Sequence, residues 1–282
     1  LTYLILHEAG VIRGTEPVLV FRWHPDLPRW ILTKALETNR KIGGANPQFE
    51  SDKHGVNFLT NLGFPVEDAR DYAGFGCSQI VPSSQRRTVG VAFEVNTALL
   101  MDLALHNGVA PRTGKQIGIE TGDARNFQRF EDVYDAFTKQ YEFIARKQLK
   151  YSKLVNAIHA EYWRAPLTSS LSPGCMENGK DVVAGGQTYN ILSSVGDRAL
   201  IDTADSLSAV KHLVFDEKQL TMAELMDALD SDFSGPRGQE IQAMCTAAPK
   251  FGNDIKKVDM MAHDVGKFSA GVIQSEKSLY GG

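Results

Sequence analysis

The chain has 282 residues, of which 43% are apolar and 23% charged, the balance of an ordinary folded protein with ample material for a core. Its 30 basic and 34 acidic residues are scattered and leave a formal net charge of −4, so the chain offers no broad attraction for nucleic acid or anionic membranes. No apolar run approaches the roughly 20 residues of a membrane-spanning helix, and no signal segment opens the chain. We expect a cytoplasmic protein without a nucleic-acid or membrane partner.

Both ends of the sequence indicate a segment of a longer polypeptide. The chain begins at Leu1, without Met, inside an apolar stretch typical of a helix interior, and it stops at Gly282 without a recognisable closing element. Length alone is equally compatible with one large domain, two ordinary ones or such a segment.

The first third predicts helices around one short buried strand. β-Branched and aromatic residues over 17–21 favour the strand. The following helix has Asp26 as its expected N-cap and ends at a glycine pair, 43–44. Shorter helices are predicted over 51–62 and 66–72.

Residues 73–79, Ala-Gly-Phe-Gly-Cys-Ser-Gln, contain two glycines and no periodicity, and a polar stretch follows over 82–87. This pattern predicts a loop whose glycines permit a tight backbone path. Cys77 therefore sits at a loop tip. From the local sequence, Cys77 is either a small buried hydrophobic residue or a reactive thiol.

Helices also dominate the remainder. The predicted elements are a buried helix over 93–106, an irregular connection over 112–128, a long helix from 133 to about 163, a loop region over 166–186, and helices over 198–214, 221–229 and 239–247, the last in the chain. Thr221 and Glu224 have the spacing of a capping box. Helices with short buried strands between them predict an α/β enzyme core.

Metal, disulfide and nucleotide motifs lack support. The three cysteines lie far apart without C-x-x-C, which predicts reduced thiols. The seven histidines form no H-x-x-x-H and none lies near a cysteine at a metal-ligand spacing, so no metal site is expected. Residues 174–180 have the spacing of a phosphate-binding loop, but Asp181 replaces the hydroxyl residue and no strand precedes them.

Five segments, in order, resemble the glycyl radical enzymes of the pyruvate formate-lyase type. They are 17–25 (PVLVFRWHP), 66–73 (VEDARDYA) leading into Gly76-Cys77, 107–114 (NGVAPRTG) with 121–123, 172–175 (SPGC) leading to 179–181, 185–186 and 189–190, and 249–254 (PKFGND) followed by Asp259. Each string is modest by itself, and the resemblance depends on their common order.

The resemblance implies an α/β fold in which residues 1–282 are a fragment of a ten-stranded barrel domain. The barrel consists of two five-stranded parallel halves, antiparallel to each other and wrapped in helices. Cys77 would carry a thiyl radical that takes hydrogen from a small-molecule substrate. The resemblance implies no bound cofactor. A glycyl radical, installed by a radical S-adenosylmethionine activase, would generate the thiyl, and the enzyme is expected to be a homodimer.

Two residues after Cys77, the sequence departs from many dehydratases of that family, which have a glutamate where this chain has Gln79. The Gln79 amide can hydrogen-bond a substrate, which makes it a candidate substrate-binding residue, but an amide cannot act as a base at neutral pH. Ser78 stands where pyruvate formate-lyase has a second cysteine, which disfavours its acyl-transfer route. A fumarate-adding, carbon–carbon or decarboxylating lyase fits better. Arg86 and Arg87 are candidates to bind a substrate carboxylate, or are simply solvated.

No Arg-Val-x-Gly-like motif occurs, so the glycine radical domain is absent from this sequence. Either a missing segment or another polypeptide would supply the glycine. The alternative is a catalytically silent scaffold or binding protein of the same fold. A weaker alternative is a Cys-dependent hydrolase.

Overall fold

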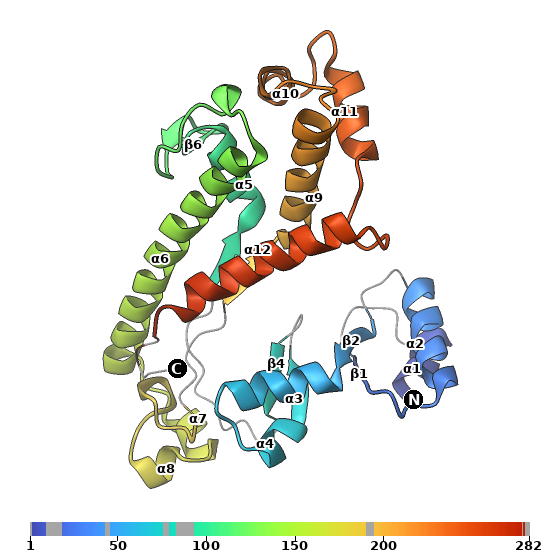
Figure 1. Ribbon diagram of the computed structural model, residues 1–282. Helices are drawn as coiled ribbons and strands as arrows, with labels where there is room; N and C mark the ends of the chain where they lie inside the picture. The colour runs from blue at the N-terminus through green and yellow to red at the C-terminus, as the bar shows by residue number, and fades with distance from the viewer. Residues whose placement is uncertain are drawn as a thin grey trace. The chain divides into compact units, whose positions relative to one another are not determined.

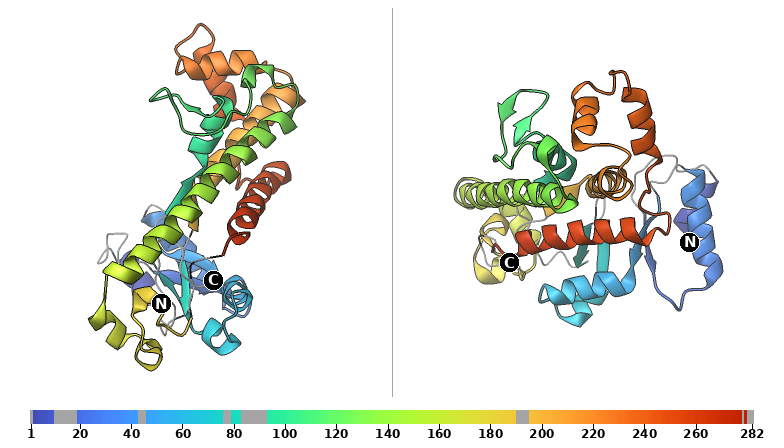
Figure 2. Two further views of the ribbon diagram at one scale, coloured as in Figure 1. Left: turned by 90° about the vertical axis from the view of Figure 1, so that its left-hand side faces the viewer. Right: turned by 45° about the horizontal axis from the view of Figure 1, so that its top comes forward.

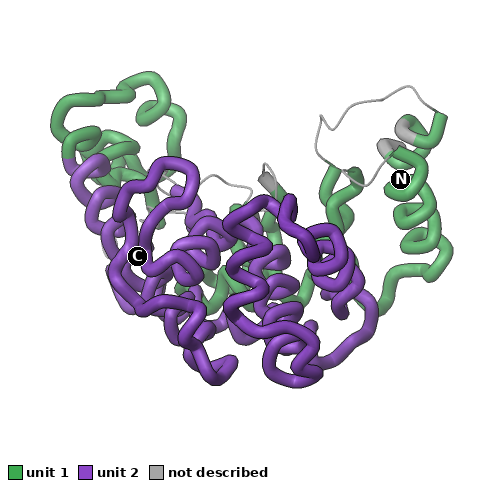
Figure 3. Tube along the Cα trace, turned by 90° about the horizontal axis from the view of Figure 1, so that it is seen from above, with its two compact units in different colours: residues 1–89, 158–192, 280–282 green, residues 90–157, 193–279 purple. Residues whose placement is uncertain are grey.

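The computed structural model describes residues 2–9, 19–42, 46–75, 79–82, 93–189, 195–277 and 279 (Figure 1). The chain forms two compact units (Figure 3). Unit 1 comprises residues 1–89, 158–192 and 280–282, and unit 2 comprises residues 90–157 and 193–279. Each unit is described by itself.

Unit 1 contains two small sheets with short helices around them. Parallel β1 (Val20–Trp23) and β2 (Gln48–Ser51) form one sheet, and antiparallel β3 (Tyr72–Phe75) and β4 (Gln79–Pro82) form the other. The helices of unit 1 are α1 (Thr2–Glu8), α2 (Arg29–Lys41), α3 (Asp52–Asn61), α4 (Val66–Arg70), the end of α6 (Phe130–Tyr162), α7 (Pro166–Leu171), α8 (Cys175–Asn178) and the 3₁₀-helix η2 (Val182–Ala184).

A side-chain cap and an ion-pair cluster hold three of these helices. Ser51 caps α3, because its hydroxyl accepts a hydrogen bond from the His54 amide over 3.4 Å. Glu8 pairs with Lys34 and Lys41 and so ties α1 to α2. The expected cap at Asp26 is wrong: α2 begins at Arg29 after Pro28, whose position suits the first turn of a helix because proline lacks an amide hydrogen.

Unit 2 is a helical layer built on one parallel strand pair, β5 (Phe93–Asn96) with β8 (Val195–Arg198). Its other elements are α5 (Thr97–Leu105), the hairpin of β6 (Val109–Ala110) and β7 (Lys115–Gln116), the 3₁₀-helix η1 (Ala124–Asn126), most of α6, α9 (Leu200–Val210), the π-helix η3 (Lys211–Asp216), α10 (Met222–Asp230), α11 (Gly238–Ala247) and α12 (Lys256–Gln274). Figure 2 shows these helices from two further sides.

The core of unit 2 gathers apolar side chains from nearly all of its helices. Phe137 and Tyr141 of α6, Leu207 of α9 and Val265 of α12 are completely buried. Aromatic rings continue along α6, where Phe137 and Tyr141 have centroids 6.3 Å apart. Because these side chains recur at helical spacing, the long helix is held along one face.

Besides the cap at Asp26, four predictions for secondary structure are wrong. Residues 73–75, expected in a loop, belong to β3. The helix expected over 93–106 starts as strand β5, and only at Asn96, whose side chain accepts a hydrogen bond from the Leu99 amide, does α5 begin. The helix α12 follows the one predicted to be last, and the region 166–186 contains α7 and α8. For β5, a strand partner distant in sequence outweighed the local pattern.

The structure supports a mixed helix-and-strand fold. Among the described residues, the strands form four two-stranded sheets. No helix in that part of the chain is long and apolar enough to cross a membrane.

Candidate functional site

The structure describes only part of the site expected from the sequence. Cys77 lies in residues 76–78, and Arg86 and Arg87 lie in residues 83–92, all outside the described residues. Gln79 is the first residue of β4, and its backbone pairs with Phe75 at the end of β3. The described part of the candidate site is therefore the β3–β4 hairpin that brackets Cys77 in the sequence, together with the side chains that hold it.

One face of the hairpin lies close to β1. A Cβ atom at Gly74 would stand 2.1 Å from a methyl carbon of Val20, well inside contact distance. Glycine at position 74 is therefore required for this close approach of β3 to β1. Ile80 of β4 is buried in the small core of unit 1, whose other members are Leu59, Phe64, Ala69 and Tyr72.

The guanidinium of Arg22 binds the start of β3. Its Nε and Nη2 atoms lie 2.7 and 2.6 Å from a carboxylate oxygen of Asp52 in α3. Nη1 donates to the carbonyl of Tyr72 over 3.0 Å, and Nη2 donates to the carbonyl of Arg70 over 2.9 Å. One side chain of β1 thus joins α3, the end of α4 and the beginning of β3.

The ring of Tyr72 completes this cluster. The Arg22 guanidinium carbon lies 3.9 Å from the ring centroid, a cation–π arrangement. On α3, a Cβ atom at Gly55 would stand 2.8 Å from the ring, so only glycine leaves room for it. Burial raises the pKa of Tyr72, although the charge of Arg22 opposes this shift. Tyr72 is therefore neutral at physiological pH.

Residues from later in the chain also reach unit 1 beside α4. The Tyr189 hydroxyl donates to the Asp68 carboxylate over 2.6 Å. The rings of Tyr189 and Phe64 have centroids 4.3 Å apart. These contacts attach Tyr189 to the segment that leads into β3.

The other two cysteines have structural surroundings. Cys175 in α8 is only 2% exposed, and burial raises the pKa of its thiol, with the charges of Asp181 and Glu177 acting in the same direction. Burial also raises the pKa of the half-buried Cys245, although Lys250 lies nearby. A raised pKa disfavours the thiolate, so neither cysteine has the surroundings of a thiolate nucleophile.

Residues 174–180, which have the spacing of a phosphate-binding loop, form a short turn instead. The helix α8 spans only four of them. The Asp181 carboxylate accepts hydrogen bonds from the amides of Ala165 and Val183, over 2.9 and 3.0 Å. Asp181 is thus occupied in holding the backbone. Among the described residues, no group of three or more His, Cys, Asp or Glu side chains is placed to hold a metal ion.

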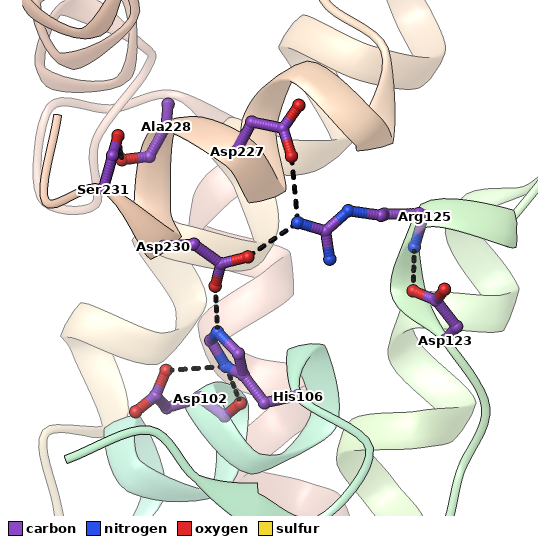
Figure 4. Close-up of polar contacts among 8 residues, drawn as sticks. All are labelled: Asp102, His106, Asp123, Arg125, Asp227, Ala228, Asp230 and Ser231. Atoms are coloured by element: carbon purple, nitrogen blue, oxygen red, sulfur yellow. Dashed lines mark hydrogen bonds and ion pairs between the residues drawn. The ribbon is translucent and has the colours of Figure 1, made fainter. Parts of the chain in front are cut away.

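Unit 2 contains the most extended charged cluster, between the ends of α5 and α10 (Figure 4). The two ring nitrogens of His106 lie 3.1 Å from the Asp102 carboxylate and 3.0 Å from the Asp230 carboxylate. Arg125 bridges Asp230 and Asp227, over 2.6 and 2.9 Å. All these partners are side chains of the same unit, so the cluster joins α5, η1 and α10 in the manner of a structural ion-pair network.

Unit 2 also has a cavity of about 450 Å³ between α5, α9, η3, α10 and α11. Its wall is mostly apolar, including Met101, Leu213 and Leu225, and Cys245 reaches it. The ammonium of Lys250 is held by the carbonyls of Cys245 and Ala248, 2.8 and 2.9 Å away. Asp102, Asp202 and Asp205 also line the cavity; the Asp102 carboxylate pairs with His106, and the Asp205 carboxylate accepts a hydrogen bond from the Phe251 amide over 2.8 Å.

Sequence reasoning did not single out Arg22, Asp52 or Tyr72. The signal was present in part: a charged residue directly follows the apolar strand run 17–21. A cation in such a position needs partners, but those partners lie 30 and 50 residues further along the chain.

The chain has a helix-rich fold with short strands. The described part of its candidate site is a short β-hairpin held by buried and charged contacts. The family model described as "Pyruvate formate lyase-like" matches residues 1–282. The chain belongs to the pyruvate formate lyase-like family.

Curated relatives and solved structures agree with this family. The chain is 32% identical over 266 residues to the trans-4-hydroxy-L-proline dehydratase of Clostridioides difficile. The aligned region covers 94% of this chain and 33% of that protein. It is 31% identical over 275 residues to the isethionate sulfite-lyase of Desulfovibrio desulfuricans, covering 95% of this chain and 32% of that enzyme. The chain thus spans about a third of the length of these relatives.

Among solved structures, the glycerol-bound B12-independent glycerol dehydratase of Clostridium butyricum superposes with a TM-score of 0.83 at 29% identity. The match covers all of this chain and 35% of that one. The hydroxyproline dehydratase of Clostridioides difficile with bound substrate gives a TM-score of 0.85 at 30% identity, covering 99% of this chain and 34% of that one.

Proposed function

We propose that this chain is the thiyl-bearing part of a glycyl radical lyase and that Cys77 carries the radical. The observation that carries the proposal is the pairing of β3 with β4 on either side of residues 76–78, in a chain of the pyruvate formate lyase-like family. Cys175 is buried in α8 and Cys245 is half-buried in α11, so neither lies in the segment between β3 and β4.

In the proposed reaction, a protein glycyl radical takes the hydrogen atom from the Cys77 thiol and leaves a thiyl radical. The thiyl takes a hydrogen atom from a substrate carbon, which re-forms the S–H bond and leaves a carbon radical. After a bond of the substrate breaks, the product radical recovers that hydrogen from Cys77. The protein mainly positions the reactants and excludes water. The glycine is supplied by a segment or polypeptide outside this sequence, and an S-adenosylmethionine radical activase installs its radical.

Gln79 limits which bond of the substrate we expect the enzyme to break. Loss of hydroxide from a substrate radical is assisted by a base or acid, and an amide side chain supplies neither at neutral pH. Sulfite and carbon dioxide can leave without being protonated. The relatives reported above are dehydratases and a sulfite-lyase, all of which eliminate a group from their substrate. We therefore place elimination of sulfite or carbon dioxide ahead of fumarate addition. Arg86 and Arg87 are the proposed partners of a substrate carboxylate or sulfonate.

Within this proposal, residues 1–282 form part of a ten-stranded barrel, and the active protein is a homodimer. The parallel pairs β1–β2 and β5–β8 support the parallel strands of such a barrel. The β3–β4 hairpin would present Cys77 inside it.

The test is turnover by the complete, anaerobically activated protein that contains this chain. Candidate substrates are isethionate, 4-hydroxyphenylacetate, trans-4-hydroxy-L-proline and glycerol, with products followed by mass spectrometry. We expect Cys77→Ala to abolish turnover while the glycyl radical signal in electron paramagnetic resonance persists. The matched control is Cys245→Ala, which should remain active.

Undiminished turnover by Cys77→Ala would overturn the proposal. An activated wild-type protein that keeps its radical but converts none of a broad panel of small organic acids, sulfonates and alcohols would favour the catalytically silent scaffold.

A further inference from the structure

We propose that Arg22 is a positioning residue that holds the start of the β3–β4 hairpin, whose two strands flank Cys77 in the sequence. The inference rests on the function proposed above, and it assigns a role in that reaction to a side chain on another strand. Its basis is the set of contacts that Arg22 makes at the entrance to β3.

The Arg22 guanidinium binds the chain on both sides of a single turn residue. Its carbonyl partners belong to Arg70, the last residue of α4, and to Tyr72, the first residue of β3. Between them the chain changes from helix to strand at Asp71. A carbonyl at the end of a helix has no partner within the helix, so Arg22 supplies a donor where local structure provides none.

The sheet cannot supply that donor at Tyr72 either. Tyr72 is the register partner of Pro82 in β4, and proline has no amide hydrogen. Arg22 therefore contributes a hydrogen bond that the neighbouring strand is unable to make at this position. The carbonyl of the first residue of β3 is therefore bound from β1.

Three further contacts hold the guanidinium itself. Asp52 binds both Nε and Nη2 of Arg22, and the Tyr72 ring lies against the guanidinium face. Tyr72 is in turn buried against Gly55. Such a planar, multiply bonded guanidinium has a defined orientation, which an ammonium group on a flexible stem does not reproduce.

A displacement at Tyr72 is transmitted along a short paired strand. β3 has four residues, and a strand rises about 3.3 Å per residue, so the fixed carbonyl lies about 10 Å along β3 from Phe75, after which residues 76–78 follow. Gly74, between the two, lies close to the Val20 side chain of β1. Transfer of an atom between reactants requires them within about 3–3.5 Å, and a misplacement of about 1 Å can cost about 100-fold in rate.

The first experiment measures how firmly the hairpin is held, without chemistry, in the complete protein that contains this chain, before activation. Hydrogen exchange by mass spectrometry is followed in wild type, Arg22→Lys and the control Arg125→Lys, which loses comparable carboxylate contacts in unit 2. We expect Arg22→Lys to speed exchange of the amides within 72–82 by about 10-fold, the loss of about 1.4 kcal/mol of local protection. Exchange in α12 and alkylation of Cys175 and Cys245 should not change.

Unchanged exchange in the hairpin would overturn the inference, because Arg22 would then have no effect on the hairpin. An equal increase throughout unit 1 would also overturn it, because the substitution would then have caused a general loss of stability. If Arg22→Lys does not fold, Asp52→Asn tests the same cluster, since it weakens the hold on Arg22 but leaves both carbonyl contacts. It should give a smaller increase confined to 72–82, and no increase would again count against the role.

The second experiment uses the activated complete protein with the substrate that it converts. Arg22→Lys should lower kcat by about 10- to 100-fold, with KM and the yield of glycyl radical close to wild type. A normal kcat in Arg22→Lys, together with an inactive Cys77→Ala, would refute the role of Arg22 and leave the proposed function intact. Full activity of Cys77→Ala would instead refute the proposed function, whatever Arg22→Lys does.

Discussion

The hydroxyl of Tyr141 in α6 donates a hydrogen bond to the carboxylate of Asp197 in β8 over 2.8 Å. Tyr141 is completely buried, and burial together with the Asp197 charge raises its pKa far above the ordinary value, so the hydroxyl keeps its proton. This bond fastens the long helix to the strand pair that underlies unit 2.

Replacing Tyr141 by Phe should therefore destabilise unit 2. The substitution removes the donor and leaves the Asp197 carboxylate without it, at an expected cost of about 1.5–3 kcal/mol in the free energy of unfolding. Urea unfolding measures the change. The matched control is Tyr134→Phe, which removes a hydroxyl from the same helix at a partly buried position. Equal effects of the two substitutions would contradict this account.

Gly74→Ala should disrupt the packing of β3 on β1. The added methyl group would overlap the side chain of Val20, and overpacking of this kind costs about 1–3 kcal/mol. Thermal unfolding should show the loss, and the double variant Gly74→Ala/Val20→Ala should recover part of it. For comparison, Gly271→Ala in α12 meets nothing within 4 Å and should be neutral or stabilising by up to about 1 kcal/mol. A Gly74→Ala protein as stable as wild type would show that the close approach is dispensable.

The contribution of Asp230 to stability should depend on pH. Burial alone would raise the pKa of Asp230, but the hydrogen bonds from Arg125 and His106 outweigh it and lower the pKa below its usual range. A lowered carboxyl pKa stabilises the folded state above the unfolded pKa of about 3.9, and this stabilisation is lost as the pH falls through the folded value. Asp230→Asn should therefore be less stable than wild type at pH 7, and the difference should disappear towards pH 3.

The neighbouring Asp102 is a control, because its pKa shift has the opposite direction. Burial raises the pKa of this carboxyl, although His106 opposes the shift. Its ionised form is thus disfavoured by folding, and Asp102→Asn should not show the same loss of stability at pH 7. If both substitutions give the same pH profile, the assignment to Asp230 is wrong.

Thr221→Ala should weaken α10 at its first turn. The Thr221 hydroxyl accepts from the Glu224 amide over 3.1 Å, and the Glu224 carboxylate accepts from the Thr221 amide over 2.9 Å. Loss of such a cap costs about 1 kcal/mol. The control Thr246→Ala removes a hydroxyl that donates only to the Gln242 carbonyl within α11, and little change in the unfolding midpoint is expected there.

Where a signal is local, the sequence by itself determined the structure. The capping box at Thr221 and Glu224 forms as predicted, and the apolar spacing from Val133 onward locates α6 to within a few residues. The short helix predicted over 51–62 is α3. Such elements depend on contacts three or four residues apart, which can be read from one stretch of chain.

Other signals were present but were not read correctly. Apolar residues of α12 recur at helical spacing through Val258, Val265 and Val272, all buried. Gly266 and Gly271 lower its intrinsic helix propensity, and packing against α9 offsets that loss. Residues 93–96, Phe-Glu-Val-Asn, alternate between apolar and polar side chains as a strand does, but so short an alternation was not separated from the start of the apolar helix that follows.

Tertiary structure alone decided the pairings. β5 becomes a strand because β8, about 100 residues later, lies parallel to it. The order of five segments places Cys77 in the family pattern, but only the folded chain brings the Arg22 guanidinium to the carbonyls of Arg70 and Tyr72. Strand pairing and side-chain contacts between distant residues depend on the whole backbone path, whereas helix periodicity and capping depend on neighbours in the chain.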